Sequence, residues 1–312
     1  HVILNNFGYR DDNVEIEKKE GILRVYSLGD SYTYGWYLDP KSAYPDVFEK
    51  LINGKHQSKV EVINASQPGF SIKESLERFE NDGLLLGPDI VTLGINIFDL
   101  LDKEFKPAVN KSSIFSYFKI YQLTFGNADR KRVEKATEEE IRRSLEGNSE
   151  QLQKFRNKVS RLNGLVKRTG AKLVLIVFPD FNPSNPNETY RFYKFHEKMK
   201  KLTADENILL VDLLDSFNKV NDKKELVLNP LDSHPSVLAH KLAAQELKRK
   251  IDFNESISSG KIVKQQFAEK EIGLGENLEN LHSIVQIFTG EERAAHFNRE
   301  FELGIQKIPF KD

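Results

Sequence analysis

The stretch Ser27-Leu-Gly-Asp-Ser-Tyr-Thr-Tyr-Gly35 places a serine, Ser31, directly after a short apolar run at residues 22–28. A run of this length predicts a buried strand, and the glycine that follows it predicts a turn out of the sheet. Far along the chain, Asp232-Ser-His-Pro235 supplies a histidine with a carboxylate two residues before it. A serine hydroxyl becomes a nucleophile when an imidazole takes its proton and a carboxylate orients that imidazole. The two stretches therefore predict that Ser31, His234 and Asp232 meet in the folded chain.

Apolar runs of strand length alternate with segments of helix length along most of the chain. The expected strands are 22–28, 60–63, 89–94, 172–178 and 208–212, and the expected helices are 41–52, 71–86, 149–168, 188–204 and 236–250. Strands that alternate with helices form right-handed βαβ units, and hence a parallel sheet covered on both faces. The expected fold class is α/β, a three-layer α/β/α domain with a central parallel, flavodoxin-like sheet.

Two further polar stretches follow the second and third expected strands. They read Asn64-Ala-Ser-Gln-Pro-Gly69 and Gly94-Ile-Asn96. An acyl-transfer site must hold an oxyanion with backbone N–H groups and side-chain amides. Gly69 allows a close approach of the backbone, and Asn96 offers an amide NH₂. Because ligands bind at the carboxyl ends of parallel strands, all these stretches are expected at one edge of the sheet.

Four residues thus appear in order, each at or just beyond the end of a strand: Ser31, Gly69, Asn96 and His234. This order resembles the SGNH (GDSL-type) hydrolase family, whose four sequence blocks are named for these residues. The resemblance implies the SGNH hydrolase fold, with Ser31 as nucleophile, His234 as general base and Asp232 as orienting carboxylate. It also implies an oxyanion hole formed by the Ser31 N–H, the Gly69 N–H and the Asn96 side chain.

The chain departs from the family pattern at two places. The third block usually reads Gly-x-Asn-Asp, and its last position here is Ile97. The fourth is often Asp-x-x-His, but Leu231 fills that place and Asp232 lies one residue closer, as in some branches of the family. Ile97 favours one different class of function, a carbohydrate- or partner-binding protein on a degenerate hydrolase fold. The intact Ser31 and His234 argue against that class.

The expected function is that of a serine esterase that hydrolyses small acyl esters, acetyl esters above all, of carbohydrate or lipid. The alternative is an O-acetyltransferase of cell-envelope polysaccharide, which would use the same residues and pass the acyl group to a sugar hydroxyl. No cofactor is expected, because the chain has neither a phosphate-binding loop nor a dinucleotide fingerprint. No metal is expected, because the histidines lack metal-ligand spacing. His196 and His240 are expected to be surface or packing residues.

The amino-acid composition limits the classes of binding partner that the sequence predicts. The net charge is −1 with Lys and Arg spread along the chain, so no nucleic-acid surface is expected. No apolar run approaches the roughly 20 residues of a membrane span, so no integral membrane segment is expected. The absence of cysteine excludes disulfides and thiolate ligands. Because the chain begins at His1, an upstream leader and an exported or periplasmic location are suggested, and the oligomeric state stays open.

The expected hydrolase domain spans residues 22–254, after an N-terminal extension or hairpin at 1–21. An insertion at 98–148 carries an aromatic cluster, and it is interpreted either as a lid or acyl-binding wall or as a helix packed on the core. Residues 255–312 are expected to form a C-terminal helical extension that docks on the domain, covers the active-site edge or makes a dimer contact. Trp36 and Tyr37 either line the substrate cleft or pack beneath it.

Overall fold

The structure is a computed structural model that describes residues 4–54, 60–101, 126–182, 185–230 and 232–251. A five-stranded parallel sheet has the order β2-β1-β3-β4-β5, which is flavodoxin-like. The strands are β1 (Leu23–Leu28), β2 (Val60–Asn64), β3 (Ile90–Ile95), β4 (Lys172–Val177) and β5 (Leu209–Asp212). The apolar runs of the sequence thus form the five strands where they were predicted.

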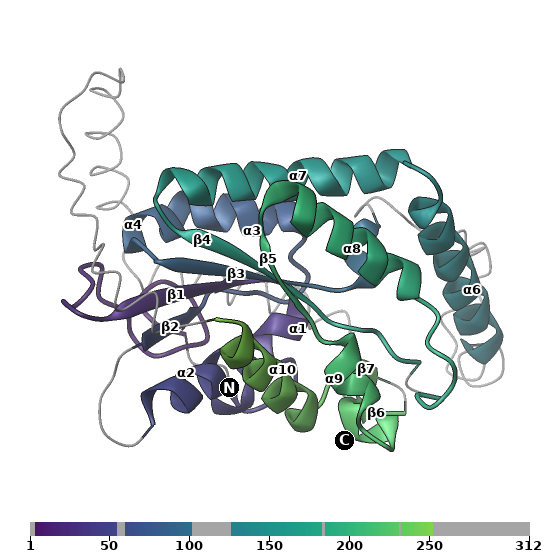
Figure 1. The fold of residues 1–312 in the computed structure, drawn as a ribbon. Coiled ribbons are helices and arrows are strands. Elements are labelled where there is room, and N and C mark those ends of the chain that lie inside the picture. Colours follow the sequence, from purple (N-terminus) through teal and green to yellow (C-terminus); the bar gives the residue numbers. More distant parts are fainter. Residues whose placement is uncertain (1–3, 55–59, 102–125, 183–184, 231, 252–312) are drawn as a thin grey trace, which may run out of the picture.

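Helices cover both faces of the sheet and complete three layers (Figure 1). One layer contains α3 (Ile72–Arg78), α4 (Leu84–Leu86), α7 (Glu150–Arg168) and α8 (Tyr193–Glu206). The opposite layer contains α1 (Ser31–Tyr34), α2 (Tyr44–Asn53), α9 (Leu214–Asn218) and α10 (Val237–Lys250). This arrangement confirms the predicted α/β/α fold. Its core is the apolar sheet interior, in which every residue of β3 is buried.

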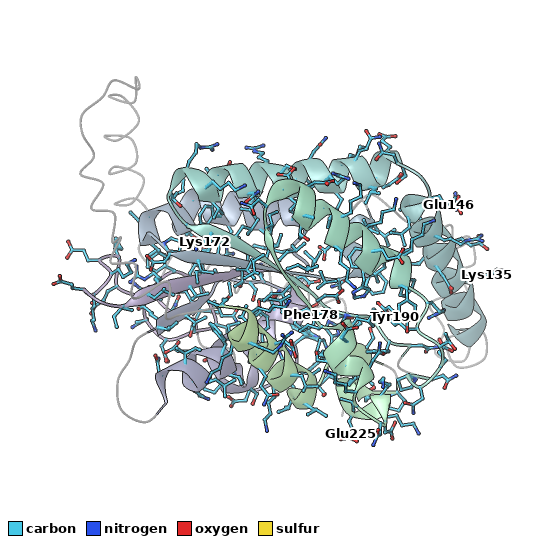
Figure 2. The ribbon with its side chains drawn as sticks, in the orientation of Figure 1. Lys135, Glu146, Lys172, Phe178, Tyr190 and Glu225 are labelled. Atoms are coloured by element: carbon cyan, nitrogen blue, oxygen red, sulfur yellow. The ribbon has the colours of Figure 1, made fainter. Side chains whose placement is uncertain are left out.

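The register of the sheet brings the carboxyl ends of its central strands together. Leu28 at the end of β1 lies opposite Leu93 of β3, and Ile95 at the end of β3 lies opposite Val177 of β4. In Figure 2, Lys172 marks the start of β4, and Phe178 lies just past its end. The residues that directly follow these strands therefore lie at one edge of the sheet, the carboxyl edge.

A short antiparallel ribbon, β6 (Val227–Asn229) and β7 (Asp232–Pro235), precedes α10. The sequence did not predict it, because segments of three and four residues are too short to show a period-two pattern. The ribbon holds His234 in an extended backbone directly before the Ser236 cap of α10, whose Oγ accepts a hydrogen bond from Ala239 N–H.

The N-terminal segment packs on the domain as turns, and residues 4–21 contain no strand, so the hairpin alternative is wrong. The reason lies in the buried Arg24 of β1. Its guanidinium donates to the carbonyl oxygens of Glu15 and Ile16 at 2.8 and 3.0 Å. A side chain thereby satisfies carbonyls that a hairpin would pair with a second strand. Tyr9, fully buried, hydrogen-bonds to Tyr26 Oη at 2.8 Å and ties the segment to the core.

Of the expected insertion, the structure describes residues 98–101 and 126–148. Its charged run forms a helix, α6 (Gly126–Leu145), which buries Ile141 and Leu145. The aromatic cluster at 115–125 and the C-terminal extension at 255–312 lie outside the described residues. Within the part of the chain that is described, no helix is both long and apolar enough to cross a membrane.

Candidate active site

Ser31 is the first residue of the one-turn helix α1, which leaves the sheet directly after β1. Asp30 caps this helix, because its Oδ1 accepts a hydrogen bond from Tyr32 N–H at 2.9 Å. Gly29 permits the turn: its φ is +148°, and a Cβ there would lie 2.2 Å from Thr33 Oγ1. Both constraints act on the backbone and place the partly exposed Ser31 at the carboxyl edge of the sheet.

The fold brings Ser31, His234 and Asp232 into one hydrogen-bonded chain. His234 Nε2 lies 2.8 Å from Ser31 Oγ, and its Nδ1 lies 2.6 Å from Asp232 Oδ1. The same Asp232 oxygen also accepts the backbone N–H of His234 at 3.0 Å. A carboxylate on Nδ1 selects the tautomer with its proton there, which leaves Nε2 as an acceptor for the serine proton. This is the arrangement that activates a serine hydroxyl.

A second carboxylate near His234 is that of Asp180, which is connected to the imidazole through Tyr32. The Tyr32 ring packs on the His234 imidazole with 5.3 Å between ring centroids. Tyr32 Oη donates to Asp180 Oδ1 at 2.7 Å and lies 3.3 Å from Ser233 Oγ. Burial raises the pKa of Asp180, and the hydrogen bonds from Tyr32 and Ser233 oppose that rise. Asp180 was not singled out from the sequence, although it follows the fourth strand just as Ser31 follows the first.

Two backbone N–H groups that the sequence assigned to an oxyanion hole, those of Ser31 and Gly69, make no hydrogen bond to another described residue. Gly69 is exposed and has a φ of +79°, and a Cβ there would meet no atom within 4 Å. A glycine is therefore favoured at this position by its left-handed backbone conformation, and not by crowding around a side chain.

Asn96, the third residue expected in the oxyanion hole, is buried just after β3. Its Nδ2 donates to Asp30 Oδ2 at 2.9 Å, and its Oδ1 accepts Phe98 N–H at 2.8 Å. An amide NH₂ has two protons, and the bond to Asp30 uses one of them. The amide is thus oriented beside the residue that precedes Ser31, with one proton left to donate.

Asp99 supplies a carboxylate at the third block, where Ile97 departs from the family pattern. Asp99 Oδ2 accepts the Asn96 N–H at 2.9 Å, while Ile97 is buried in the core. Burial and the nearby negative charge of Asp30 raise the pKa of Asp99 well above its usual range. Burial likewise raises the pKa of Asp30, against the hydrogen bonds that it accepts. Two carboxylates therefore hold Asn96 from either side, one at its backbone and one at its amide.

The two remaining described histidines are packing residues and not surface residues. His196 is buried with Nδ1 2.7 Å from Asp212 Oδ1 and Nε2 2.8 Å from Tyr190 Oη. His240 is buried, and its Nδ1 accepts Tyr44 N–H at 3.0 Å. Burial lowers the pKa of His240 to about 3. Over the described ranges, no three His, Asp or Glu side chains are grouped in a way that could hold a metal ion.

Comparison with known proteins finds one matching family model and similar solved structures. The model of the GDSL-like lipase/acylhydrolase family matches residues 27–242. The lipase/acylhydrolase of Enterococcus faecalis is similar in structure, with a TM-score of 0.50 and 18% identity over 74% of this chain and 95% of that one. The acetyl xylan esterase AlAXEase has a TM-score of 0.50 and 16% identity over 74% of this chain and 100% of that one. Among curated proteins, none matches significantly.

At these identities the two solved structures show a shared fold. The family match is the stronger finding, because it extends from the end of β1 into α10 and covers well over half of the 312 residues. It includes Ser31, Gly69, Asn96 and His234. The chain belongs to the GDSL-like lipase/acylhydrolase family.

Proposed function

We propose that this hydrolase is a serine esterase that cleaves small acyl esters, acetyl esters above all, by forming an acyl-enzyme on Ser31. The observation that carries the proposal is the pair of hydrogen bonds on His234, 2.8 Å to Ser31 Oγ and 2.6 Å to Asp232 Oδ1. A neutral imidazole held in this way can take the serine proton at the moment of attack.

In the first half of the proposed reaction, Ser31 Oγ attacks the ester carbonyl while His234 Nε2 takes its proton. The N–H groups of Ser31 and Gly69 and the Asn96 amide stabilise the negative oxygen of the tetrahedral intermediate. The intermediate collapses when His234 gives its proton to the departing alcohol oxygen. The acyl group then remains bonded to Ser31 Oγ.

In the second half, His234 takes a proton from water, and the resulting hydroxide attacks the acyl carbonyl. The bond to Ser31 Oγ breaks, the acid leaves, and His234 returns its proton to the serine. Asp232 stays ionised throughout and keeps the Nδ1 proton of the imidazole in place. A polysaccharide O-acetyltransferase differs only in this half, where a sugar hydroxyl replaces the water.

Acetyl esters of carbohydrate are the first candidate substrates. One protein of the same fold is an acetyl xylan esterase, and Ser31 is partly exposed. An inactive binding protein was favoured by Ile97 alone. Asp99 holds the Asn96 backbone at 2.9 Å, so this departure leaves Asn96 in position.

The substrate class is tested with p-nitrophenyl acetate, butyrate and octanoate, followed by an acetylated xylo-oligosaccharide. We expect p-nitrophenol release to fall with chain length, and acetate release from the sugar ester without an added acceptor. If the acetyl group leaves only when a sugar acceptor is added, the protein is an acetyltransferase and not an esterase. If p-nitrophenyl octanoate is turned over faster than p-nitrophenyl acetate, the substrates are lipid esters and not acetyl esters.

Asp232→Asn is expected to lower kcat by about 10⁴-fold, less than loss of the serine or the histidine, because the base remains but its tautomer and orientation are lost. Asp180→Asn is the matched variant, since Asp180 accepts a hydrogen bond from Tyr32 at 2.7 Å, whereas the ring nitrogens of His234 pair with Asp232 and Ser31. We expect the larger loss from Asp232→Asn, measured as kcat on p-nitrophenyl acetate. The reverse order would assign the orienting role to Asp180.

A further inference from the structure

A tight turn follows the nucleophile helix and has an unusual residue at its corner. Leu38 N–H donates to Gly35 O at 3.0 Å, which closes a four-residue turn with Trp36 and Tyr37 in the middle. Tyr37 has a φ of +61°. Positive φ at the third position of a turn favours glycine or asparagine, and it strains a bulky side chain. The other described non-glycine residue with positive φ, Asn207, is of the tolerated type.

A buried arginine from the N-terminal segment holds this turn. Arg10 donates to Tyr34 O at 2.6 Å and to Gly35 O and Leu38 O at 3.1 Å each. Its guanidinium also stacks on the Tyr34 ring, 4.1 Å from the centroid. The turn is therefore fixed from both sides, and the strained backbone of Tyr37 is imposed by the surrounding fold.

Core packing does not account for Tyr37. Its side chain is 74% exposed, the most exposed large hydrophobic residue among those described. Its ring contacts Trp36 edge-on, with 5.0 Å between centroids. A residue that has a strained backbone and buries little apolar surface is typical of functional sites, where the surrounding structure offsets the free-energy cost of the strain.

The turn is joined directly to the nucleophile. Trp36 N–H donates to Ser31 O at 3.1 Å, which closes the end of α1 and holds the backbone of Trp36 against that of the serine. Exposed apolar side chains also follow the other site residues, Phe98 after Asn96 and Val237 after His234. The backbone of the ring pair is in addition held by the three hydrogen bonds from Arg10.

We infer that Trp36 and Tyr37 form a sugar-binding platform, which takes a pyranose ring of the alcohol part of the ester. The inference rests on the proposed function and names its substrate class. A pyranose packs its C–H face on an aromatic ring and keeps its hydroxyls in water, which suits an open, amphipathic tyrosine. An acyl chain gains most when it is removed from water on all sides, and a ring that is 74% exposed does not provide that.

The platform can be tested without turnover, because Trp36 is the single tryptophan of the chain. Its fluorescence is titrated with xylotetraose, with cellotetraose and with monomeric octanoate, which stands for an eight-carbon acyl chain. We expect a saturable change with at least one of the sugars, lost in Tyr37→Gly and retained in Tyr37→Phe. No response to either sugar, an equal response in Tyr37→Gly, or saturation by octanoate alone would overturn the platform.

Kinetics separate this proposal from the proposed function. Tyr37→Gly is expected to raise KM for an acetylated xylo-oligosaccharide about tenfold, the size of one aromatic contact. Its kcat, and its kcat/KM on p-nitrophenyl acetate, should stay near wild type. Unchanged KM for the sugar ester would overturn the platform and leave the esterase standing. An inactive wild type would instead contradict the proposed function, while the fluorescence titration still decides on the platform.

The matched control for the backbone is Asn207→Gly. It replaces the other non-glycine residue at positive φ, at the end of α8, and removes no aromatic ring. Glycine relieves the strain but gains freedom in the unfolded chain, so Tm should change little in both variants. Only Tyr37→Gly should affect the sugar titration and KM. A similar effect of both variants would assign the result to the backbone and overturn the platform.

Discussion

Ser31→Ala is expected to lower kcat for p-nitrophenyl acetate by about 10⁵- to 10⁶-fold while the protein stays folded. The substitution removes the atom that becomes acylated, and no other described group lies at its position next to His234 Nε2. The fold should tolerate it, because the cap of α1 runs from Asp30 to Tyr32 N–H and does not involve the Ser31 hydroxyl. Steady-state kinetics and a thermal melt measure the two halves of this prediction.

Intact-protein mass spectrometry adds a direct readout. A slowly hydrolysed ester should leave one acyl group on the wild type and none on Ser31→Ala. Ser160→Ala is the control, since Ser160 lies on α7 and donates to Glu206 Oε1 at 2.6 Å, away from the site. Turnover by Ser31→Ala within tenfold of the wild type would remove Ser31 from the role of nucleophile.

His234→Ala is expected to lose about as much activity as Ser31→Ala, because residues that act as one unit fail together. Without the imidazole, the Ser31 hydroxyl keeps its proton and is a poor nucleophile. The imidazole is 26% exposed on its ribbon, so its removal should leave a site that solvent can reach. Added imidazole should therefore restore part of the rate, as measured by p-nitrophenol release with and without it.

Ser31→Ala is the matched control for this rescue, because imidazole can replace a missing base but not a missing hydroxyl. Rates of both variants are compared after subtraction of the uncatalysed reaction with imidazole. Equal acceleration of the two variants would show solution catalysis only. A His234→Ala enzyme with near wild-type kcat would require another base at the site.

The sheet could be predicted from the sequence because each strand is a local signal. The run Lys172–Val177, for example, is apolar enough to be recognised without any knowledge of its neighbours. The capping box at the start of α3 is also a local feature, since Glu74 lies three residues after Ser71 and accepts its N–H at 2.9 Å. The N-terminal hairpin failed as a prediction because the carbonyls of that segment are satisfied by Arg24, a contact that no local pattern encodes.

The part of the candidate site that could be predicted consists of residues in short sequence motifs that follow strands. Asp180 and Asp99 were not singled out from the sequence because their contacts are with other residues of the site, Asp180 with Tyr32 and Asp99 with the Asn96 backbone. Lone aspartates in loops are common and carry no motif. Position after a strand was the one signal that could have pointed to Asp180. The catalytic roles themselves stay predictions until the variants above are measured.

The sequence by itself determined the fold class, the family and the identity of Ser31, Gly69, Asn96 and His234 as candidates. These follow from apolar periodicity and short motifs, which are properties of neighbouring residues. The sequence also predicted that His234 meets Ser31, and the structure makes this contact across 203 positions. The tertiary structure alone decided that Tyr32 meets Asp180 and that Arg10 holds the Tyr37 turn. Such contacts depend on the order of strands in the sheet and on the paths of the loops between them. A local pattern sets what each segment becomes, but the packing of all segments sets what each side chain touches.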